Sequence, residues 1–244
     1  MSEWWTYRPS SFLLFSERTY HRLFELVNTG HGPAPVVAGL LGLALLVLLA
    51  RGGERPERAA LGLLAAAWLW VGWAFHLQRY AAIHLAATGF AAAFVVQGVL
   101  LLLASATVAA RRAESPWRRH IGLGLVLLAV GAYPLLAPLA GRPWRQAELF
   151  GLAPDPTALA TLGALLCLGA TGPTHSAGTG AAAEAAHPAL PARHLRRGWL
   201  DSLLWPLPVL WCGVTGLTLW AMNAPLAAAM PGLAVLALLA RAGR

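Results

Sequence analysis

The stretch Pro-Ala-Pro-Val-Val-Ala-Gly-Leu-Leu-Gly-Leu-Ala-Leu-Leu-Val-Leu-Leu-Ala at 33–50 contains no charged residue, and Arg-Gly-Gly-Glu-Arg-Pro-Glu-Arg follows it at 51–58. An α-helix rises about 1.5 Å per residue, so about 20 apolar residues cross the hydrocarbon core of a bilayer. The stretch therefore predicts a transmembrane helix that ends at a short, arginine-rich loop.

The same pattern recurs along the rest of the chain, where apolar stretches alternate with short charged loops. The predicted spans are 33–50, 59–78, 82–110, 121–140, 157–172, 199–222 and 225–240. We expect an all-α integral membrane bundle of about seven transmembrane helices. Pro134 and Pro138 should kink the fourth span, and Pro206 and Pro208 the sixth, because proline removes a helical hydrogen bond.

The composition supports the bilayer as the solvent of this chain. Apolar residues make up 58% of it and charged residues only 11%, against about 25% charged in an average soluble protein. All eighteen basic residues are Arg, which excludes proteins that need a Schiff-base lysine or a Walker-type phosphate loop. The positive charge lies in clusters between the spans, so we expect no nucleic-acid partner.

The positions of the arginines predict the orientation. If seven helices alternate in direction, twelve arginines lie in the loops and tail on one side, and six lie on the other. Basic residues are enriched in cytoplasmic loops. We therefore expect a multi-pass protein of the bacterial inner membrane with a periplasmic N-terminus and a cytoplasmic C-terminus.

The segment before the first span has a different pattern. From Ser16, a helix would place Tyr20, Leu23, Phe24 and Val27 on one face. The charged or polar residues that would face away are Glu17, Arg18, His21, Arg22 and Glu25. This pattern predicts an amphipathic helix that lies at the membrane interface.

The domain organisation follows from these patterns. Residues 1–32 form the interfacial segment, and residues 33–172 contain the first five spans. Residues 173–198 are rich in Ala, Gly, Ser, Thr and Pro, which predicts a flexible cytoplasmic linker. Residues 199–244 contain the last two spans and a short basic tail. The lipid bilayer is the expected partner, together with other membrane subunits if the chain works in a complex.

Polar residues gather at the predicted outer boundary of the membrane. The candidate polar site consists of His76, Gln78, Arg79, Tyr80, His84, Glu148 and Asp155. One interpretation is that these residues anchor the helices at the interface and cap a helix start. The other is a pocket for an ion or small solute, in which Glu148 and Asp155 pair with Arg79 or Arg145.

Metal and cofactor motifs are absent from the sequence. Cys167 and Cys212 lie inside apolar stretches, and neither belongs to a CxxC motif. His175, His187 and His194 are too widely spaced, with no cluster of cysteines or carboxylates beside them, to predict a metal site. We therefore predict no metal, no cofactor and no catalytic residue, which favours a non-enzymatic role.

Several motifs resemble a family of bacterial inner-membrane proteins catalogued as a domain of unknown function. They include Trp-Ala-Phe-His-Leu-Gln-Arg-Tyr at 73–80 and Tyr-Pro-Leu-Leu-Ala-Pro at 133–138. The longest is Gly-Arg-Pro-Trp-Arg-Gln-Ala-Glu-Leu-Phe-Gly-Leu-Ala-Pro-Asp-Pro-Thr-Ala at 141–158. The resemblance covers nearly the whole chain and implies a polytopic membrane protein, but it implies no activity.

Three functions stay open on the sequence. A permease-like protein for a small solute or ion is favoured by the kinked helices and the polar outer boundary. A structural or accessory subunit of a membrane complex is favoured by the scarcity of charge within the spans. A haem- or metal-binding redox protein is the least favoured of the three.

Overall fold

The computed structural model describes residues 15–107, 115–168 and 200–243 of the chain. These ranges contain no strand, and one isolated bridge joins Phe150 to Ala153. The principal helices are α1 (Glu17–Gly30), α2 (Ala34–Arg51), α3 (Glu54–Val71), α4 (Ala87–Thr107), α5 (Pro116–Leu127), α6 (Leu136–Leu139), α7 (Pro154–Leu168), α9 (Pro206–Ala221) and α10 (Ala229–Ala242). The predicted all-α class is confirmed.

Several helices have the character of membrane spans. In the described residues, five are long and apolar enough to cross a bilayer, namely Ala34–Arg51, Glu54–Ala82, Ala87–Thr107, Pro116–Leu139 and Leu200–Ala221. Two further apolar helices, Pro154–Leu168 and Ala229–Ala242, are shorter. The structure therefore supports a membrane protein, and five of the seven predicted spans reach spanning length.

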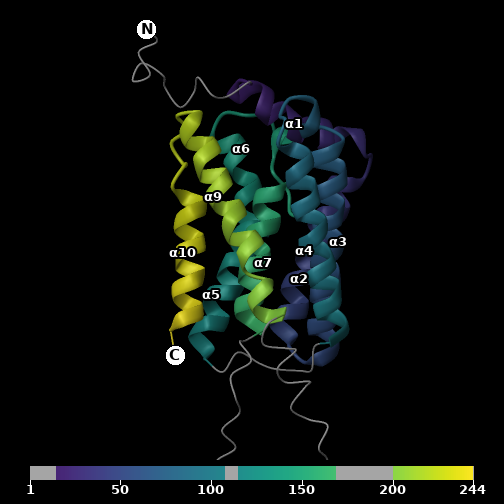
Figure 1. Cartoon of the computed structure of the whole chain (residues 1–244), viewed down its shortest axis with the longest axis vertical. Helices are drawn as coiled ribbons and strands as arrows, with labels where there is room; N and C mark the ends of the chain where they lie inside the picture. The colour runs from purple at the N-terminus through teal and green to yellow at the C-terminus, as the bar shows by residue number, and fades with distance from the viewer. Residues whose placement is uncertain (1–14, 108–114, 169–199, 244) are drawn as a thin grey trace, which may run out of the picture.

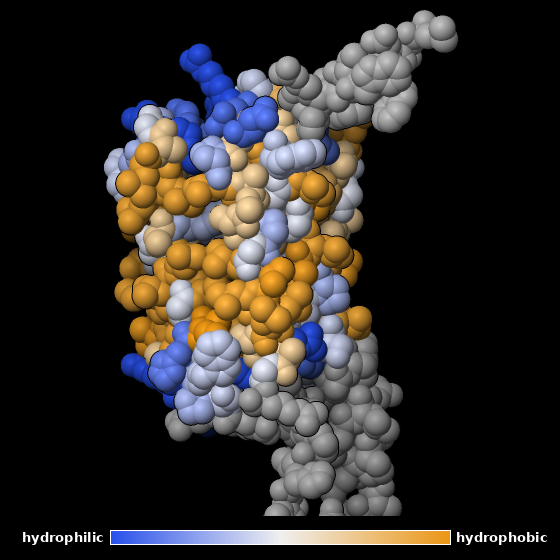
Figure 2. Space-filling view, turned by 90° about the vertical axis from the view of Figure 1, so that its left-hand side faces the viewer, coloured by the Kyte–Doolittle hydropathy of each residue, from blue (hydrophilic) through white to orange (hydrophobic). Residues whose placement is uncertain are grey.

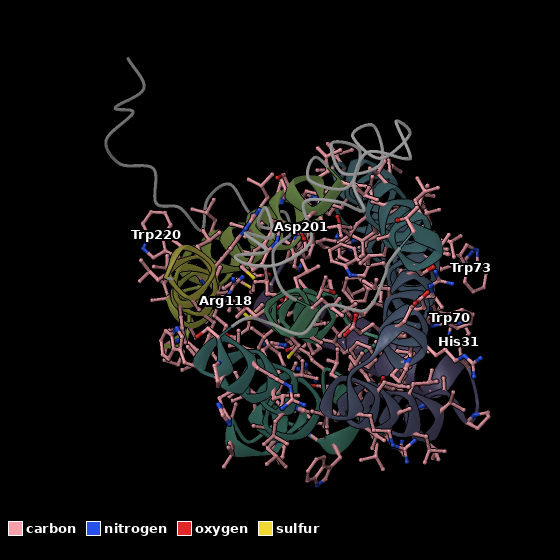
Figure 3. All side chains as sticks on the ribbon, turned by 90° about the horizontal axis from the view of Figure 1, so that it is seen from below. His31, Trp70, Trp73, Arg118, Asp201 and Trp220 are labelled. Atoms are coloured by element: carbon pink, nitrogen blue, oxygen red, sulfur yellow. The ribbon has the colours of Figure 1, made fainter. Side chains whose placement is uncertain are left out.

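The surface agrees with this assignment. On the face that Figure 2 shows, an apolar band crosses the middle of the bundle, with hydrophilic residues at both ends. Trp70 and Trp73 lie beside His31 on one side of the bundle, and Trp220 lies on the opposite side (Figure 3). All three tryptophans are exposed. Exposed tryptophans near the ends of apolar helices are typical of the membrane–water interface.

Helix α7 occupies the centre of the bundle (Figures 1 and 3). Its residues from Pro154 to Cys167 are all buried. Gly163 of α7 and Gly122 of α5 pack backbone to backbone, since a Cβ added to either would lie 2.5 Å from the other's carbonyl oxygen. Small residues let membrane helices approach this closely. A short, fully enclosed helix therefore forms the core around which the longer helices pack.

The turn between α2 and α3 is tighter than predicted. We expected a loop over 51–58, but α3 begins at Glu54 and only Gly52 and Gly53 separate the two helices. Both glycines have positive φ values of 63° and 99°, a conformation that residues with a Cβ rarely adopt. Glu54 and Glu57 lie in the first turn of α3, where the helix dipole favours negative charge.

The N-terminal amphipathic helix is present as α1. Ser16 caps it by accepting a hydrogen bond from the backbone N–H of Thr19, and the predicted apolar face is buried. His21 is a correction, because we placed it on the exposed face and it is only 7% exposed. Its burial follows from the loop after α6, whose Arg142 lies against it.

The predicted proline kinks have different outcomes. Before Pro134 the fourth span widens into a π-helical segment, Leu128–Ala132, and then tightens into a 3-10 turn, Tyr133–Leu135. Pro206 instead starts α9 after a turn at Leu204 and Trp205, where its missing N–H costs nothing. The predicted linker 173–198, with its three histidines, lies outside the described residues.

Candidate functional site

A cavity of ≈ 510 Å³ lies at the end of the bundle where α1 packs, and we call it the polar pocket. It lies between α1, residues 128–142, the start of α7 and the α9–α10 hairpin. Its polar lining consists of Glu17, Tyr20, His21, Tyr133, Arg142, Glu148 and Asp155. Most of the remaining lining residues are apolar, so a few charged groups face a largely hydrophobic wall.

Asp155 is the most enclosed charged residue of the polar pocket. It lies in the first turn of α7, between two prolines, and is 2% exposed. Tyr133 donates a hydrogen bond to its Oδ2 (3.1 Å), and Trp211 and Thr215 each donate to its Oδ1 (2.7 Å). The donors come from two other helices, so the carboxylate holds three segments together at the start of the central helix.

Glu148, Arg142, His21 and Glu17 form a second polar cluster. Arg142 is 3.8 Å from Glu148 and donates to Nδ1 of His21 (2.8 Å), while Nε2 of His21 is 3.5 Å from Glu17. Burial and Asp155 raise the pKa of Glu148 to about 8, while Arg142 opposes the shift. Burial and Arg142 lower the pKa of His21 to about 4. His21 is therefore neutral at physiological pH.

The loop 141–153 is fixed to its surroundings by side-chain hydrogen bonds. Asn28 of α1 donates to the backbone carbonyls of Arg145 (2.9 Å) and Ala147 (2.8 Å). Thr157 of α7 accepts a hydrogen bond from the backbone N–H of Gly151 (2.9 Å), which has a positive φ of 77°. These contacts hold Glu148 inside the bundle, where it is 8% exposed.

His76 lies in the π-helical segment Gly72–Leu77 that follows α3, and it is fully buried. Neither of its ring nitrogens has a hydrogen-bond partner in the described part of the chain. Its ring centroid lies 4.5 Å from that of Phe94 and 5.0 Å from that of Trp211. Trp211 therefore contacts His76 with its ring and Asp155 with its indole N–H.

Comparison with known proteins places this architecture in a family. Residues 17–173, more than half of the chain, match DUF6064, which is described as a family of unknown function. The chain belongs to the DUF6064 family. The predicted resemblance to a domain of unknown function is thereby confirmed. No curated protein and no solved structure matches the chain.

The DUF6064 match contains only part of the polar pocket. Tyr133, Arg142, Glu148 and Asp155 lie within the matched residues. The match ends before α9, so Trp211 and Thr215, which donate to Asp155, lie beyond it, as does α10. The family segment therefore supplies the charged groups of the pocket, and the α9–α10 hairpin supplies one of its walls.

The structure separates the predicted site residues of this DUF6064 protein into two groups. Glu148 and Asp155 line the polar pocket, where Glu148 pairs with Arg142 rather than with Arg79 or Arg145. The other predicted residues, His76, Gln78, Arg79, Tyr80 and His84, do not line it. Of these, Gln78 is exposed. The ring of Tyr80 lies tilted at 4.9 Å, between centroids, from that of His84, whose pKa is lowered by burial.

Sequence reasoning missed several residues of the pocket in this DUF6064 chain. Tyr133 lies within a predicted span, but nothing in the sequence connects it to Asp155. Thr215 gave no signal, because a threonine in an apolar helix commonly bonds to its own backbone. Arg142 served only as one of the arginines from which the orientation in the membrane was predicted. Each contact with Asp155 spans at least 22 residues of sequence, so local patterns do not report it.

The polar pocket offers groups that can bind a small molecule. In the described ranges, no three His, Cys, Asp or Glu side chains are grouped so that they could hold a metal ion. The carboxylates, Arg142 and the hydroxyls offer charge and hydrogen bonds to a small molecule, and the apolar wall offers hydrophobic contact. A mostly apolar cavity of this size with a few convergent polar groups is typical of small-molecule sites.

Proposed function

We propose that this protein is a permease-like membrane protein that binds a small solute in the polar pocket and moves it across the bilayer. The observation that carries the proposal is the buried carboxylate of Asp155 in the lining of a ≈ 510 Å³ cavity. Ionisable residues within apolar helix bundles are costly, and they commonly mark the path of a solute or ion.

The interrupted helices around the pocket support this proposal. The central helix α7 starts only at Pro154, after the irregular loop 141–153, and the fourth span departs from α-helical geometry over Leu128–Leu135. Irregular backbone at membrane depth is tolerated where it is buried in protein or lines a cavity. Transporters place substrate sites at helices interrupted in this way.

Cysteine accessibility tests the proposal. Leu128 lines the pocket from the π-helical segment of the fourth span. We would introduce Leu128→Cys into a chain whose buried Cys167 and Cys212 are replaced by alanine. A membrane-impermeant thiol reagent should label it in both right-side-out and inside-out vesicles, because a permease exposes its site to each side in turn.

A matched variant controls for vesicle sidedness. Gln78→Cys lies at an exposed position that does not line the pocket and should react from one side only. An accessory subunit with a fixed cavity predicts that Leu128→Cys also reacts from that side alone, and this result would refute the permease. We propose an inner-membrane location and a periplasmic position of the pocket from the arginine distribution, and the side from which the control cysteine reacts tests the second.

A further inference from the structure

The polar pocket has an imbalance of charge. Glu17, Glu148 and Asp155 contribute three carboxyl groups, but Glu148, whose pKa burial and Asp155 raise to about 8, keeps its proton at neutral pH. The carboxylates of Glu17 and Asp155 therefore face the single guanidinium of Arg142. Arg142 is engaged by Glu148 at 3.8 Å and by the ring of His21 at 2.8 Å. His21 adds no positive charge, because burial and Arg142 lower its pKa to about 4. The pocket therefore lacks counter-charge for its carboxyl groups.

Asp155 is the carboxyl group of the pocket with the least counter-charge. All three of its hydrogen-bond donors are neutral, namely the hydroxyls of Tyr133 and Thr215 and the indole of Trp211. Within the described residues, no Arg or His nitrogen lies within 4.0 Å of its carboxyl oxygens. Neutral donors orient a carboxylate without cancelling its charge, and a buried charge without a partner is strongly unfavourable.

The lining of the pocket indicates which class of positively charged ligand fits beside Asp155. Leu136, Leu219, Leu226, Met230 and Leu233 give it a broad apolar surface. An inorganic cation such as Ca²⁺ takes six to eight oxygen ligands, and Mg²⁺ retains several waters. Asp155 carries three donated hydrogen bonds already, and the described residues hold no cluster of metal-binding side chains. An apolar body with one positive group suits this surface better.

We propose that the polar pocket binds a protonated amine with a small apolar body. The ammonium group donates to Asp155 Oδ2, which accepts from Tyr133 alone among the described residues, and the body packs on the leucines of the wall. A charged donor to a buried carboxylate makes a stronger hydrogen bond than a neutral one. This inference rests on the proposed function only in that the pocket is a solute site.

Binding of three matched probes tests the proposal on the full chain in detergent. Benzylamine, benzyl alcohol and benzoate share one ring and differ in charge at about pH 7. Benzylamine should raise the melting temperature and bind with a measurable Kd by calorimetry, and the other two should not. Thr215→Val, which removes a neutral donor and keeps the carboxylate, should still bind benzylamine.

Two further variants locate the charge. Asp155→Asn should weaken benzylamine binding at least about tenfold. Asp201→Asn, whose carboxyl pairs with Arg241 near the C-terminus, should leave it unchanged. If Asp155→Asn does not fold, Glu17→Gln still reports, because it removes a half-exposed pocket carboxylate and should weaken binding about twofold to threefold.

Each contrary result is informative. Binding of benzoate in place of benzylamine would overturn the amine and point to Arg142 as an anion site. Stabilisation by sodium chloride that competes with benzylamine would replace the organic cation with an inorganic one. Absence of binding by all three probes would also overturn the proposal. The labelling of Leu128→Cys is independent of these measurements, so two-sided labelling without amine binding would leave the permease intact.

Discussion

Asp155 and His76 are both fully enclosed polar residues, and both contact Trp211, yet their surroundings differ. Asp155 accepts three hydrogen bonds from residues of two other helices. His76 packs against aromatic rings, among them Phe94 and Trp211, and has no hydrogen-bond partner in the described residues. Buried polar groups are normally satisfied, and an unsatisfied one calls for an explanation. The carboxylate of Asp155 is thus satisfied by hydrogen bonds, whereas burial of the unpaired imidazole of His76 costs free energy.

The two residues also differ in whether they line the polar pocket. Asp155 lines the polar pocket, so its hydrogen bonds orient a group that a solute can reach. His76 does not line the pocket, although it shares a neighbour with Asp155, because both residues contact Trp211. A Trp N–H donates but does not accept a hydrogen bond. Trp211 therefore packs between the two residues and does not conduct a proton from one to the other.

The largest expected effect comes from removing the carboxylate. Asp155→Ala leaves the donors of Tyr133, Trp211 and Thr215 without an acceptor, at about 1–3 kcal/mol for each buried donor. We expect the free energy of unfolding, measured by SDS titration, to fall by at least about 3 kcal/mol. The control is Glu54→Ala, whose half-exposed pair with Arg58 is worth less than about 1 kcal/mol. Equal effects in both variants would show that the hydrogen bonds of Asp155 contribute nothing.

A smaller effect concerns pH and the carboxyl of Glu148. Because its pKa is raised to about 8 from 4.5, the native state keeps a proton that the unfolded chain loses, and stability falls as pH rises through this interval. His21 acts in the opposite direction between about 4 and 6.5, since its native pKa is lowered. Of these two groups, only Glu148 titrates between pH 6.5 and 8.

We therefore expect the wild-type protein to lose on the order of 1 kcal/mol of stability between these two pH values. Glu148→Gln should not show this loss, because its amide does not titrate. Denaturant titrations of both proteins at the two pH values measure the difference. A loss of the same size in Glu148→Gln would assign the pH dependence to other groups.

Replacing the imidazole tests the other half of the comparison. His76→Phe removes two unsatisfied nitrogens and keeps a planar ring beside Phe94 and Trp211, so stability should rise by about 1 kcal/mol. His84→Phe is the matched control, because Nδ1 of His84 already accepts from the backbone N–H of Ala86. We expect no gain there. A marked loss of stability in His76→Phe would mean that the imidazole has a polar partner after all.

The sequence predicted what local patterns determine. Ser16 and the spacing of apolar residues after it gave α1, and uninterrupted apolar stretches gave the longer spans. The central position of α7 could not be predicted, because side chains that face lipid and side chains that face protein are both apolar. The burial of Glu148 and Asp155 could not be predicted either, because it depends on which helices pack around the start of α7.

The smallest expected effect concerns Arg79. The sequence suggested that Arg79 pairs with Glu148 or Asp155, but it follows His76 in the chain and does not line the pocket. Its guanidinium lies instead against Gly30, at the end of α1. A double-mutant cycle of Arg79→Ala with Asp155→Asn should give a coupling free energy below about 0.5 kcal/mol, as for independent sites.

The matched cycle pairs Arg142→Ala with Glu148→Gln, two residues 3.8 Å apart and both largely buried. Residues that share an ion pair couple by about 0.5–3 kcal/mol, so this cycle should exceed the first. Both cycles are measured by the same SDS titration, which cancels errors of the method. If Arg79 couples to Asp155 as strongly as Arg142 does to Glu148, Asp155 has a resident cation and the pocket has no need of an amine. Independence of Arg79 would instead leave the carboxylate with neutral donors alone, as the amine proposal requires.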